Sequence, residues 1–400
     1  MKDMTLRDSR WFRRALAVPL CLVLNVATVS SMTADVPGTV LPAGPMHIAR
    51  QEHTATLLRS GEVLVAGGMD CTASCRILAS AELYNPRTRK WRSTGTMHTA
   101  RRDHTATLLP NGQVLVTGGY GGGCPPCRTL ASAELYDPHT GGWRQTGHMV
   151  GARFSHIATL LPTGKVLVLG GRNCAQSACT SVSSAEVYLP RTGKWAATRH
   201  LPEQGCGGTA TLLHQGWIFV TCDNGSGETY DPRTGQWKAT VGMSTARTGP
   251  TVALLHNGQV LVAGGCCGPS GVLASSDLYD PRTGQWKVTG SMSTARSGPT
   301  AVLLRNGQVL VTGGGDSRSG VLSSAELYNP RTGTWRPTGG MTTPRQANTL
   351  TLLGNGQVLA TGGFSGGCPP CKSLSSAELY NPRTGKWGAT GSMTATASVK

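Results

Sequence analysis

The chain has 400 residues, a formal net charge of +17 and a hydrophobic fraction of 38%. Counted with its 54 glycines and without its 8 tyrosines, the apolar share comes close to the ~45–50% of ordinary folded domains. This composition argues against a largely disordered chain, so we expect one folded core over most of the length.

The N-terminal segment differs from the rest of the chain. Five bases within the first fourteen residues precede an apolar stretch from Ala15 to Val29, and small residues follow. This order predicts a secretory signal peptide over residues 1–31, cleaved after Ser31 or, as a second choice, after Ala34. An uncleaved membrane anchor is the alternative, although the apolar run is short for a bilayer span. We therefore expect a secreted, periplasmic or cell-surface protein.

The next segment, residues 32–45, is a candidate closing strand. The run from Thr39 to Met46 resembles the sequence that ends each of the later repeats. It would compete with or cover the C-terminal strand that contains Trp387. We expect the folded domain itself to occupy residues 46–400.

Seven repeats fill that domain. Each contains an inner strand, a turn, a Val-Leu-Val-x-Gly-Gly segment, an Ala-Glu-Leu-Tyr segment, a Pro-Arg-Thr-Gly turn and a tryptophan, with local departures. A period of about 50 residues is typical of β-propeller arrays. The tryptophans that close repeats one to seven are Trp91, Trp143, Trp195, Trp237, Trp286, Trp335 and Trp387.

Within each repeat the pattern predicts four short antiparallel strands, because short apolar runs alternate with strong turn residues. Asn111-Gly112 and its equivalents indicate a tight hairpin whose two central residues have positive φ. The Gly-Gly pairs suit places where two backbones approach too closely for a Cβ atom. The predicted fold is an all-β, seven-bladed propeller with four antiparallel strands per blade.

The order and spacing of the Gly-Gly, Tyr and Trp residues resemble the kelch repeat, from Met46 to Met393. The resemblance implies a kelch propeller similar to the central domain of galactose oxidase and to sialic acid mutarotases. It implies no single function, because one scaffold carries enzymes and binding proteins alike.

Cysteine usage favours export. Without Cys21, which lies in the predicted signal, twelve cysteines remain, and most occur as local couples. We interpret them as short disulfides, with zinc binding and a redox Cys-Pro-Pro-Cys loop as alternatives. Cys206 and Cys222 are left over, one diagonal step apart across a predicted hairpin, and the adjacent Cys266 and Cys267 could pair with each other. The couples are Cys71 and Cys75, Cys124 and Cys127, Cys174 and Cys179, Cys266 and Cys267, and Cys368 and Cys371.

The two faces of such a propeller differ in sequence. The first and third turns of every repeat share one face, and these turns are short and alike; we call it the turn face. The second-to-third loops and the crossovers between repeats share the other face, and these loops differ; we call it the variable face. Specificity on repeated scaffolds usually resides in loops that differ, so we expect a ligand there.

A ring of arginines is the first candidate site on the variable face. Each precedes an innermost strand, and together they could bind a carboxylate or sulfate at the mouth of the channel. The alternative, which the pattern favours, is structural: each repeat also carries one acid at a fixed position, and the two charges would pair. The arginines are Arg50, Arg101, Arg153, Arg247, Arg296 and Arg345, and the acids are Glu82, Glu134, Glu186, Glu228, Asp277, Glu326 and Glu378.

A second group of candidates consists of polar residues that do not repeat. They are where catalysis or ligand recognition would depart from the scaffold, and four of them enter the predicted binding site: Tyr120, Arg172, Asp316 and Arg318. The others are Asp70, His98 and Asp223.

Catalytic motifs are absent from the sequence: there is no Gly-x-Ser-x-Gly elbow, His-Glu-x-x-His or P-loop. A copper oxidase would need a tyrosine linked to a cysteine, a second tyrosine and two histidines, but Tyr120 is the only tyrosine outside the repeat pattern. We expect a binding module for a glycan or a protein, without catalytic residues, metal or cofactor. A carbohydrate-active enzyme similar to kelch mutarotases or galactose oxidase is the alternative.

The net charge of the chain indicates which kinds of binding partner to expect. The predicted signal contains five bases and two acids, a contribution of +3, which leaves +14 for the remaining chain. Such a protein could associate electrostatically with an anionic surface. Nucleic acid fits poorly, because the excess bases lie in turns around a rim and not along a groove with stacking aromatics. We expect a monomer.

Overall fold

The computed structural model describes residues 45–121, 128–175, 178–202, 206–266, 271–317, 319–366 and 371–390. Their regular secondary structure is entirely β-strand. Among them, no helix has the length and apolarity needed to cross a membrane. The predicted signal peptide, the candidate closing segment up to residue 44, Cys124, Cys127, Cys267, Arg318 and Cys368 lie outside these residues.

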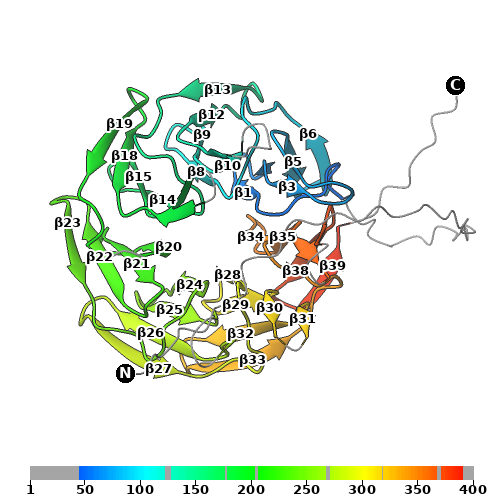
Figure 1. The fold of residues 1–400 in the computed structure, drawn as a ribbon. Coiled ribbons are helices and arrows are strands. Elements are labelled where there is room, and N and C mark those ends of the chain that lie inside the picture. The colour runs from blue at the N-terminus through cyan, green and yellow to red at the C-terminus, as the bar shows by residue number, and fades with distance from the viewer. Residues whose placement is uncertain are drawn as a thin grey trace, which may run out of the picture. The chain divides into compact units, whose positions relative to one another are not determined.

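The described residues form seven four-stranded antiparallel sheets, one for each repeat, with the first strand of each sheet toward the centre (Figure 1). Sheets one to three contain β1 (Thr54–Leu57), β2 (Val63–Ala66), β5 (Ala81–Asn85) and β6 (Lys90–Ser93); β8 (Thr105–Leu108), β9 (Val114–Thr117), β12 (Ala133–Tyr136) and β13 (Trp143–Thr146); and β14 (Ile157–Leu160), β15 (Val166–Leu169), β18 (Ala185–Leu189) and β19 (Lys194–Thr198).

Sheets four to seven follow the same order. They contain β20 (Cys206–Leu212), β21 (Ile218–Cys222), β22 (Gly227–Asp231) and β23 (Gln236–Ala239); β24 (Thr251–Leu254), β25 (Val260–Ala263), β26 (Ser276–Asp280) and β27 (Gln285–Thr289); β28 (Thr300–Leu303), β29 (Val309–Thr312), β32 (Ala325–Asn329) and β33 (Thr334–Thr338); and β34 (Thr349–Leu352), β35 (Val358–Thr361), β38 (Ala377–Asn381) and β39 (Lys386–Ala389).

Short extra strands decorate the loops of the variable face. A three-stranded sheet joins a crossover to a loop in repeat two, and two-stranded hairpins occur in repeats one, three, six and seven. These strands are β3 (Met69–Asp70) and β4 (Arg76–Ile77); β7 (Arg101–Arg102), β10 (Tyr120–Gly121) and β11 (Arg128–Thr129); β16 (Arg172–Ala175) and β17 (Ala178–Ser181); β30 (Gly315–Asp316) and β31 (Gly320–Val321); and β36 (Phe364–Ser365) and β37 (Lys372–Ser373).

Tyrosine and tryptophan lock neighbouring sheets together. In sheet two, Tyr136 lies directly opposite Trp143 across two strands, and their ring centroids are 5.0 Å apart. Both rings pack into the core between sheets one and two. The hydroxyl of Tyr136 bonds Thr94 Oγ1 of sheet one at 2.9 Å, and Trp143 Nε1 donates to the carbonyl of Gly95 at 2.8 Å. The pair therefore fills the wedge and satisfies its polar atoms in the adjacent repeat.

The Gly-Gly pairs occupy crowded positions, as the sequence predicts. Gly67 and Gly68 have φ values of +63° and +93°. A Cβ atom on Gly67 would lie 2.6 Å from the carbonyl oxygen of Arg101 in the next repeat, and one on Gly68 would lie 2.5 Å from that of Gln51. Any side chain here would collide with backbone, which has little freedom to move.

The first hairpins differ from the prediction. Only the glycine of Asn111-Gly112 has positive φ, at +87°. Gly112 donates its amide to the carbonyl of Leu109, and Leu109 donates to Gln113, which closes a three-residue loop around a turn. Residue 110, which begins this turn, is a proline with φ fixed near −65°, and such a turn followed by a left-handed glycine is the common three-residue hairpin. Two-residue turns were therefore the wrong expectation.

The hydroxyl of Tyr136 provides a stability test. Tyr136→Phe removes a hydrogen bond between two sheets and should lower the free energy of unfolding by about 1 kcal/mol. Tyr84→Phe is the matched control, because Tyr84 packs on Trp91 at the same 5.0 Å while its buried hydroxyl bonds no described residue. Urea unfolding with an unchanged m-value measures both. Equal losses in the two variants would contradict the role of the Thr94 bond.

Candidate functional site

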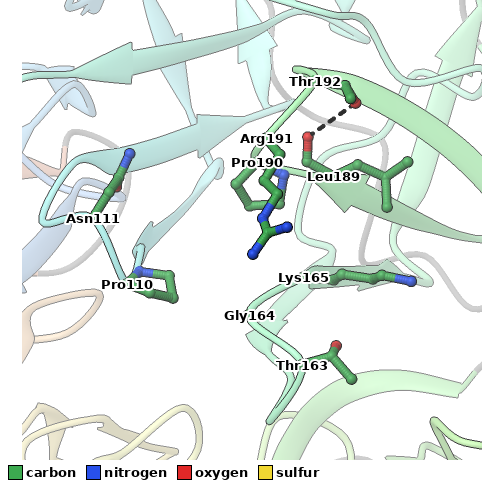
Figure 2. A pocket seen from close by; sticks show the side chains of 9 residues that line it. All are labelled: Pro110, Asn111, Thr163, Gly164, Lys165, Leu189, Pro190, Arg191 and Thr192. Carbon is green, nitrogen blue, oxygen red and sulfur yellow. Dashed lines mark hydrogen bonds between the residues drawn. The ribbon is translucent and has the colours of Figure 1, made fainter.

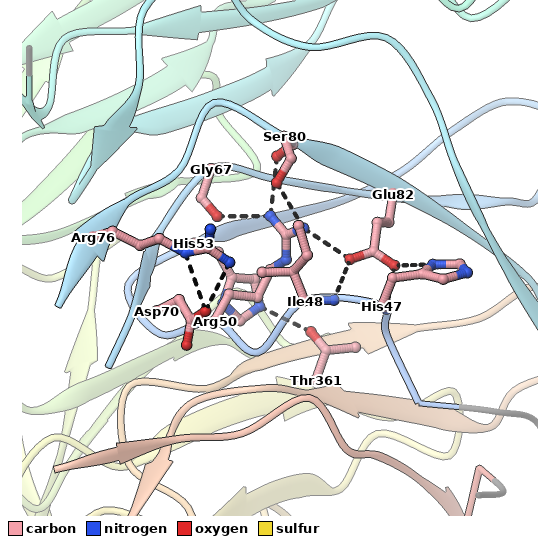
Figure 3. Close-up of polar contacts among 10 residues, drawn as sticks. All are labelled: His47, Ile48, Arg50, His53, Gly67, Asp70, Arg76, Ser80, Glu82 and Thr361. Atoms are coloured by element: carbon pink, nitrogen blue, oxygen red, sulfur yellow. Dashed lines mark hydrogen bonds and ion pairs between the residues drawn. The ribbon is translucent and has the colours of Figure 1, made fainter. Parts of the chain in front are cut away.

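The arginine ring of the variable face is buried. Arg50 has no exposed surface, and its guanidinium binds the carbonyls of Gly67 and Ser80 at 2.9 and 3.0 Å, the hydroxyl of Ser80 at 3.2 Å and Glu82 Oε1 at 2.8 Å (Figure 3). Burial lowers the pKa of Arg50, and Glu82 opposes that shift. The guanidinium is therefore committed to the protein's own groups.

The acid of each pair also holds the crossover. Glu82 Oε2 accepts the backbone amide of His47 at 2.7 Å, and Glu82 Oε1 accepts that of Ile48 at 3.2 Å. His47 Nδ1 lies 2.7 Å from the same carboxylate, with nearly half of its side chain exposed. One acid thus fixes the chain just before the inner strand and neutralises the arginine that follows.

The other five arginines repeat this geometry. Each lies no more than 1% exposed, and each nitrogen-to-oxygen distance falls between 2.7 and 3.1 Å. This burial leaves almost no guanidinium surface for a ligand, and the geometry is that of the structural alternative. The pairs are Arg101 with Glu134, Arg153 with Glu186, Arg247 with Asp277, Arg296 with Glu326, and Arg345 with Glu378.

Three histidines lie beside this ring, inside the inner layer. His53 Nε2 lies 3.0 Å from Thr361 Oγ1, and His156 Nε2 lies 3.1 Å from Thr117 Oγ1. Burial, reinforced by the nearby arginines, lowers the pKa of both to about 3. They are neutral packing residues near pH 7, the role that their repeated phase indicates.

Unrepeated side chains gather just outside the ring, at the crossovers of the first three repeats. Arg102 Nη1 contacts Glu52 and lies 2.9 Å from Asp103 Oδ2. Its guanidinium carbon stands 5.2 Å from the ring centroid of Tyr120, which packs on Phe154 at 5.4 Å. About a quarter of each charged side chain is exposed. We call these five residues the crossover cluster.

The local backbone explains how the cluster is placed. Arg102 in β7 lies opposite Tyr120 in β10, so the cation sits over the aromatic ring. Glu52 and Asp103 have φ values of +56° and +51°, and the equivalent residues in repeats five and six are Gly249 and Gly298. A left-handed conformation costs a non-glycine residue roughly 1–2 kcal/mol. Ser155 and Ala347 hold the same left-handed conformation in repeats three and seven, so the conformation belongs to the repeated backbone, and only the acidic side chains are particular to repeats one and two.

The backbone at the position of Glu52 and Asp103 also links neighbouring repeats. The amide of Asp103 donates to the carbonyl of Glu52 at 3.1 Å, and the amide of Ser155 donates to that of Asp103 at 2.9 Å. The two carboxylates therefore come from adjacent repeats and meet at the same arginine.

Within the crossover cluster, Asp103 is a carboxyl group whose pKa is shifted. Its pKa is raised to about 7, mainly by burial and then by Glu52, against the opposing effect of Arg102. A carboxyl that titrates near neutral pH beside a second carboxyl can take up and release a proton under working conditions. The cluster thus combines a cation, an aromatic surface and a proton-exchanging acid.

The remaining predicted site residues lie at different distances from the cluster. Arg172, exposed in β16, exchanges two backbone hydrogen bonds of 2.9 Å with Phe154, which brings it beside the cluster with Tyr120. It also lies near Asp223. Burial raises the pKa of Asp223, and the positive charge of Arg172 opposes that rise. Asp316 is in β30 of repeat six, where its carboxylate accepts bonds from Ser317 and Ser319. It is not part of the cluster.

The other unrepeated candidates have local partners. Asp70 accepts bonds from Thr72 and Arg76, and His98 Nδ1 lies 3.0 Å from Glu134. Sequence reasoning missed Glu52, Arg102, Asp103 and Phe154. A usable signal was present, because glycine holds the same phase as Glu52 and Asp103 in two other repeats.

Two predicted disulfides are present. Cys71 is bonded to Cys75, and Cys174 to Cys179. Cys222, Cys266 and Cys371 are also disulfide-bonded. Cys206 and Cys222 are direct cross-strand partners, not diagonal ones, because the register shifts between Cys206 and Ala210. Counting from the hairpin could not include that bulge.

Comparisons with known proteins agree with this architecture. The model of a family described as "Kelch motif" matches residues 57–98, 101–149, 247–293, 296–342 and 348–394, more than half of the chain. An F-box/kelch-repeat protein of Arabidopsis thaliana is 33% identical over 142 residues, covering 35% of this chain and 36% of the relative. Kelch-like protein 34 of Homo sapiens is 31% identical over 155 residues, or 38% and 23% of the two chains.

Galactose oxidase of Gibberella zeae is 27% identical over 139 residues, covering 32% of this chain and 20% of the relative. These three matches therefore span about a third of their relatives' lengths or less. A fungal alcohol oxidase of the AA5 family in complex with copper aligns with a TM-score of 0.65 at 18% identity, over 82% of this chain and 73% of its own. A structure of YjhT aligns at 0.56 and 13%, over 86% and 98%.

The sheets and these structural likenesses define the class as an all-β propeller. The chain belongs to the kelch-repeat family, on the strength of the motif matches.

The fungal alcohol oxidase with a similar fold was solved in complex with copper. Within the described part of the chain, no three His, Cys, Asp or Glu side chains are grouped to hold a metal. Five of the repeat tyrosines bond threonines between sheets, as Tyr188 does with Thr146 at 2.8 Å, and His156 lies within hydrogen-bonding distance of Thr117.

Titration of Asp103 tests the electrostatics of the crossover cluster. Its carboxyl should titrate near pH 7 by carbon-detected NMR, Glu52→Gln should lower that pKa, and Arg102→Gln should raise it. Because the folded-state pKa is raised, the stability contributed by protonated Asp103 should be present below about pH 4 and lost as the pH rises through about 7. Asp280, whose pKa is lowered by Arg282, is the reference. Titration of Asp103 near pH 4 would contradict the description.

Proposed function

We propose that this protein is an exported binding module that recognises a glycan or protein partner on its variable face. The observation that carries the proposal is the crossover cluster. Its arginine, two carboxylates and two aromatic rings are unrepeated and partly exposed. Exposed aromatic and arginine side chains are the residues that most often anchor a partner.

Export is supported by the disulfides and the N-terminal sequence. Short disulfides persist in oxidising compartments and are rare in the cytosol. Together with the basic and apolar start of the chain, they favour a signal peptide over residues 1–31 and a mature protein outside the cytoplasm.

We also propose that the seven sheets close as one seven-bladed ring over residues 46–390. Support comes from the contact between the last sheet and the first. Leu359 and Leu379 share a core cluster with Val63 and Tyr84, and Arg50 donates its backbone amide to Leu374 at 3.1 Å. Deletion of residues 35–45 tests whether the N-terminal segment takes part in closing the ring. A lowered melting temperature is expected if that segment closes the ring, and an unchanged one would show that it does not.

The binding proposal is tested by screening the protein on arrays of possible partners. The oxidised protein would be screened on a glycan array and on an array of extracellular proteins, with Arg102→Gln and Tyr120→Ala beside it. Partners of the variable face should lose at least tenfold in affinity with either variant, since an anchor side chain contributes about 2 kcal/mol or more. Arg336→Gln, on the exposed outer strand β33, is the charge-matched control. No partner on either array, or partners indifferent to both cluster variants, would contradict the proposal.

The second candidate function is a carbohydrate-active enzyme at the same cluster. One observation favours it: Asp103, with a pKa of about 7 and a second carboxyl beside it, suits proton transfer to or from a sugar hydroxyl. Asp103→Asn should then abolish turnover in mutarotation or sugar-oxidation assays while partner binding persists. No turnover by the unmodified protein would contradict the enzyme function, and turnover that survives this substitution would contradict the role of Asp103.

A further inference from the structure

A groove of about 730 Å³ lies on the turn face, away from the crossover cluster. It separates the first hairpin of sheet two, at Pro110 and Asn111, from two turns of sheet three, at Thr163 to Lys165 and at Leu189 to Thr192 (Figure 2). Its volume is within the ~300–1,000 Å³ range of small-ligand sites. No site is predicted here from the sequence, because the turns of this face look alike.

The two hairpins at this groove lack a bridge that occurs elsewhere on the turn face. In repeat one, Arg59 follows the inner strand and reaches the carbonyl of Pro110 in the next hairpin. In repeat six, Arg305 reaches the carbonyl of Gly354 in the same way, at 2.6 Å. The equivalent residue in repeat two is Pro110, which is too short to bridge and has no hydrogen to donate. The second and third hairpins are therefore not joined by this arginine bridge.

Charge distinguishes this groove from the turns of repeats four and five. In repeats four and five the turn begins with an aspartate that contacts its own arginine: Asp231 with Arg233 at 3.5 Å and Asp280 with Arg282 at 3.2 Å. In repeat three the turn begins with Leu189. Neither Arg191 nor Lys165 forms an ion pair with any described residue, so both cations are available.

Arg191 is placed to use that charge. Its side chain is exposed, and its guanidinium points into the space between Pro110 and the Thr163 to Lys165 turn (Figure 2). A planar guanidinium presents paired donors that match a carboxylate or a sulfate. Asn111 and Thr163 add neutral polar groups at the groove, while Pro110 and Leu189 supply apolar surface.

A second groove repeats the arrangement. It has a volume of about 300 Å³ and lies between the hairpin of His256 and the turns of sheet six, where Arg331 holds the position of Arg191. The turn begins with Asn329, again not an acid, and the hairpin carries His256 where repeats one and six have arginine. An open gap beside a turn arginine without a neighbouring aspartate thus occurs twice on this face.

The lining favours a saccharide over a peptide. Peptides are usually bound by pairing with an open strand edge or by burying an apolar anchor in an aromatic or deep pocket. This groove is built from turns, apart from Leu189 at the end of β18, and its lining includes no aromatic residue. A sugar acid offers one anionic group for Arg191 and Lys165 and hydroxyl groups for the amide and hydroxyl side chains.

We propose that the groove lined by Pro110, Lys165 and Arg191 binds an acidic saccharide through its carboxylate or sulfate group. The site is separate from the variable face. It gives the excess positive charge of the chain a definite role at one place, in addition to diffuse attraction to anionic surfaces.

The test compares two charged saccharides with a neutral one. Binding of trigalacturonate, a sulfated chondroitin disaccharide and maltotriose would be measured by calorimetry at 50 and 150 mM salt. Trigalacturonate or the sulfated disaccharide should bind, and the better of the two identifies the anionic group. Maltotriose should not bind. Arg191→Gln should weaken binding at least tenfold, the effect of losing hydrogen bonds from a charged donor, and Lys165→Gln should weaken it about threefold, as expected for a single partly screened charge.

The matched control is Arg383→Gln. Arg383 occupies the same turn position in repeat seven, also without an aspartate at the start of the turn, but Arg305 bridges the neighbouring hairpins there. This variant should keep affinity within twofold. Unchanged melting temperatures would verify that the variants are folded.

Three results would overturn the proposal. One is no detectable binding of either acidic saccharide at millimolar concentration. Another is an equal loss of affinity for Arg383→Gln and Arg191→Gln, which would mean diffuse charge attraction. The last is hexaglutamate binding as tightly as the saccharides with the same dependence on Arg191, which would point to an acidic peptide.

Discussion

The buried arginine–carboxylate pair is the contact on which the arrangement of this propeller depends. In six repeats it holds three segments together: the crossover that enters the inner strand, the Gly-Gly end of the second strand, and the start of the third strand. Removing one member of such a pair leaves an uncompensated charge inside the protein, at a cost of about 3–5 kcal/mol. Because the acid also binds crossover amides, the pair determines where the variable face begins and where the residues after each arginine are placed.

The crossover cluster follows from that placement. Glu52 and Asp103 stand two residues after paired arginines, at a position whose backbone joins one repeat to the next. The scaffold tolerates left-handed acids there because the paired arginines and their neighbours fix the surrounding chain. Arg102 extends over Tyr120 since β7 and β10 are in register. Rigid repetition thus supplies the support, and a few unrepeated side chains supply the chemistry, as is common for loops on repeated scaffolds.

Repetition made the strands, the Gly-Gly positions and the two local disulfides predictable. The charge of the arginines and the phase of the acids indicated pairing, but the complete burial that favours a structural role depends on packing between elements distant in sequence. Three features lay beyond pattern reading: the bulge that aligns Cys206 with Cys222, the proline-led three-residue hairpin at Pro110, and the meeting of Glu52 with Asp103 across two repeats. Each depends on backbone geometry or on a neighbour about fifty residues away, which no local pattern encodes.

The most direct measurement is a double-mutant cycle on Arg153 and Glu186, in repeat three, followed by urea unfolding. The side chains meet at 2.9 Å with almost no solvent exposure. Arg153→Met and Glu186→Leu should each lower the free energy of unfolding by about 3–5 kcal/mol, and the double variant should lose much less than the sum. Additive losses, or single losses below about 0.5 kcal/mol, would contradict the central role of the buried pair.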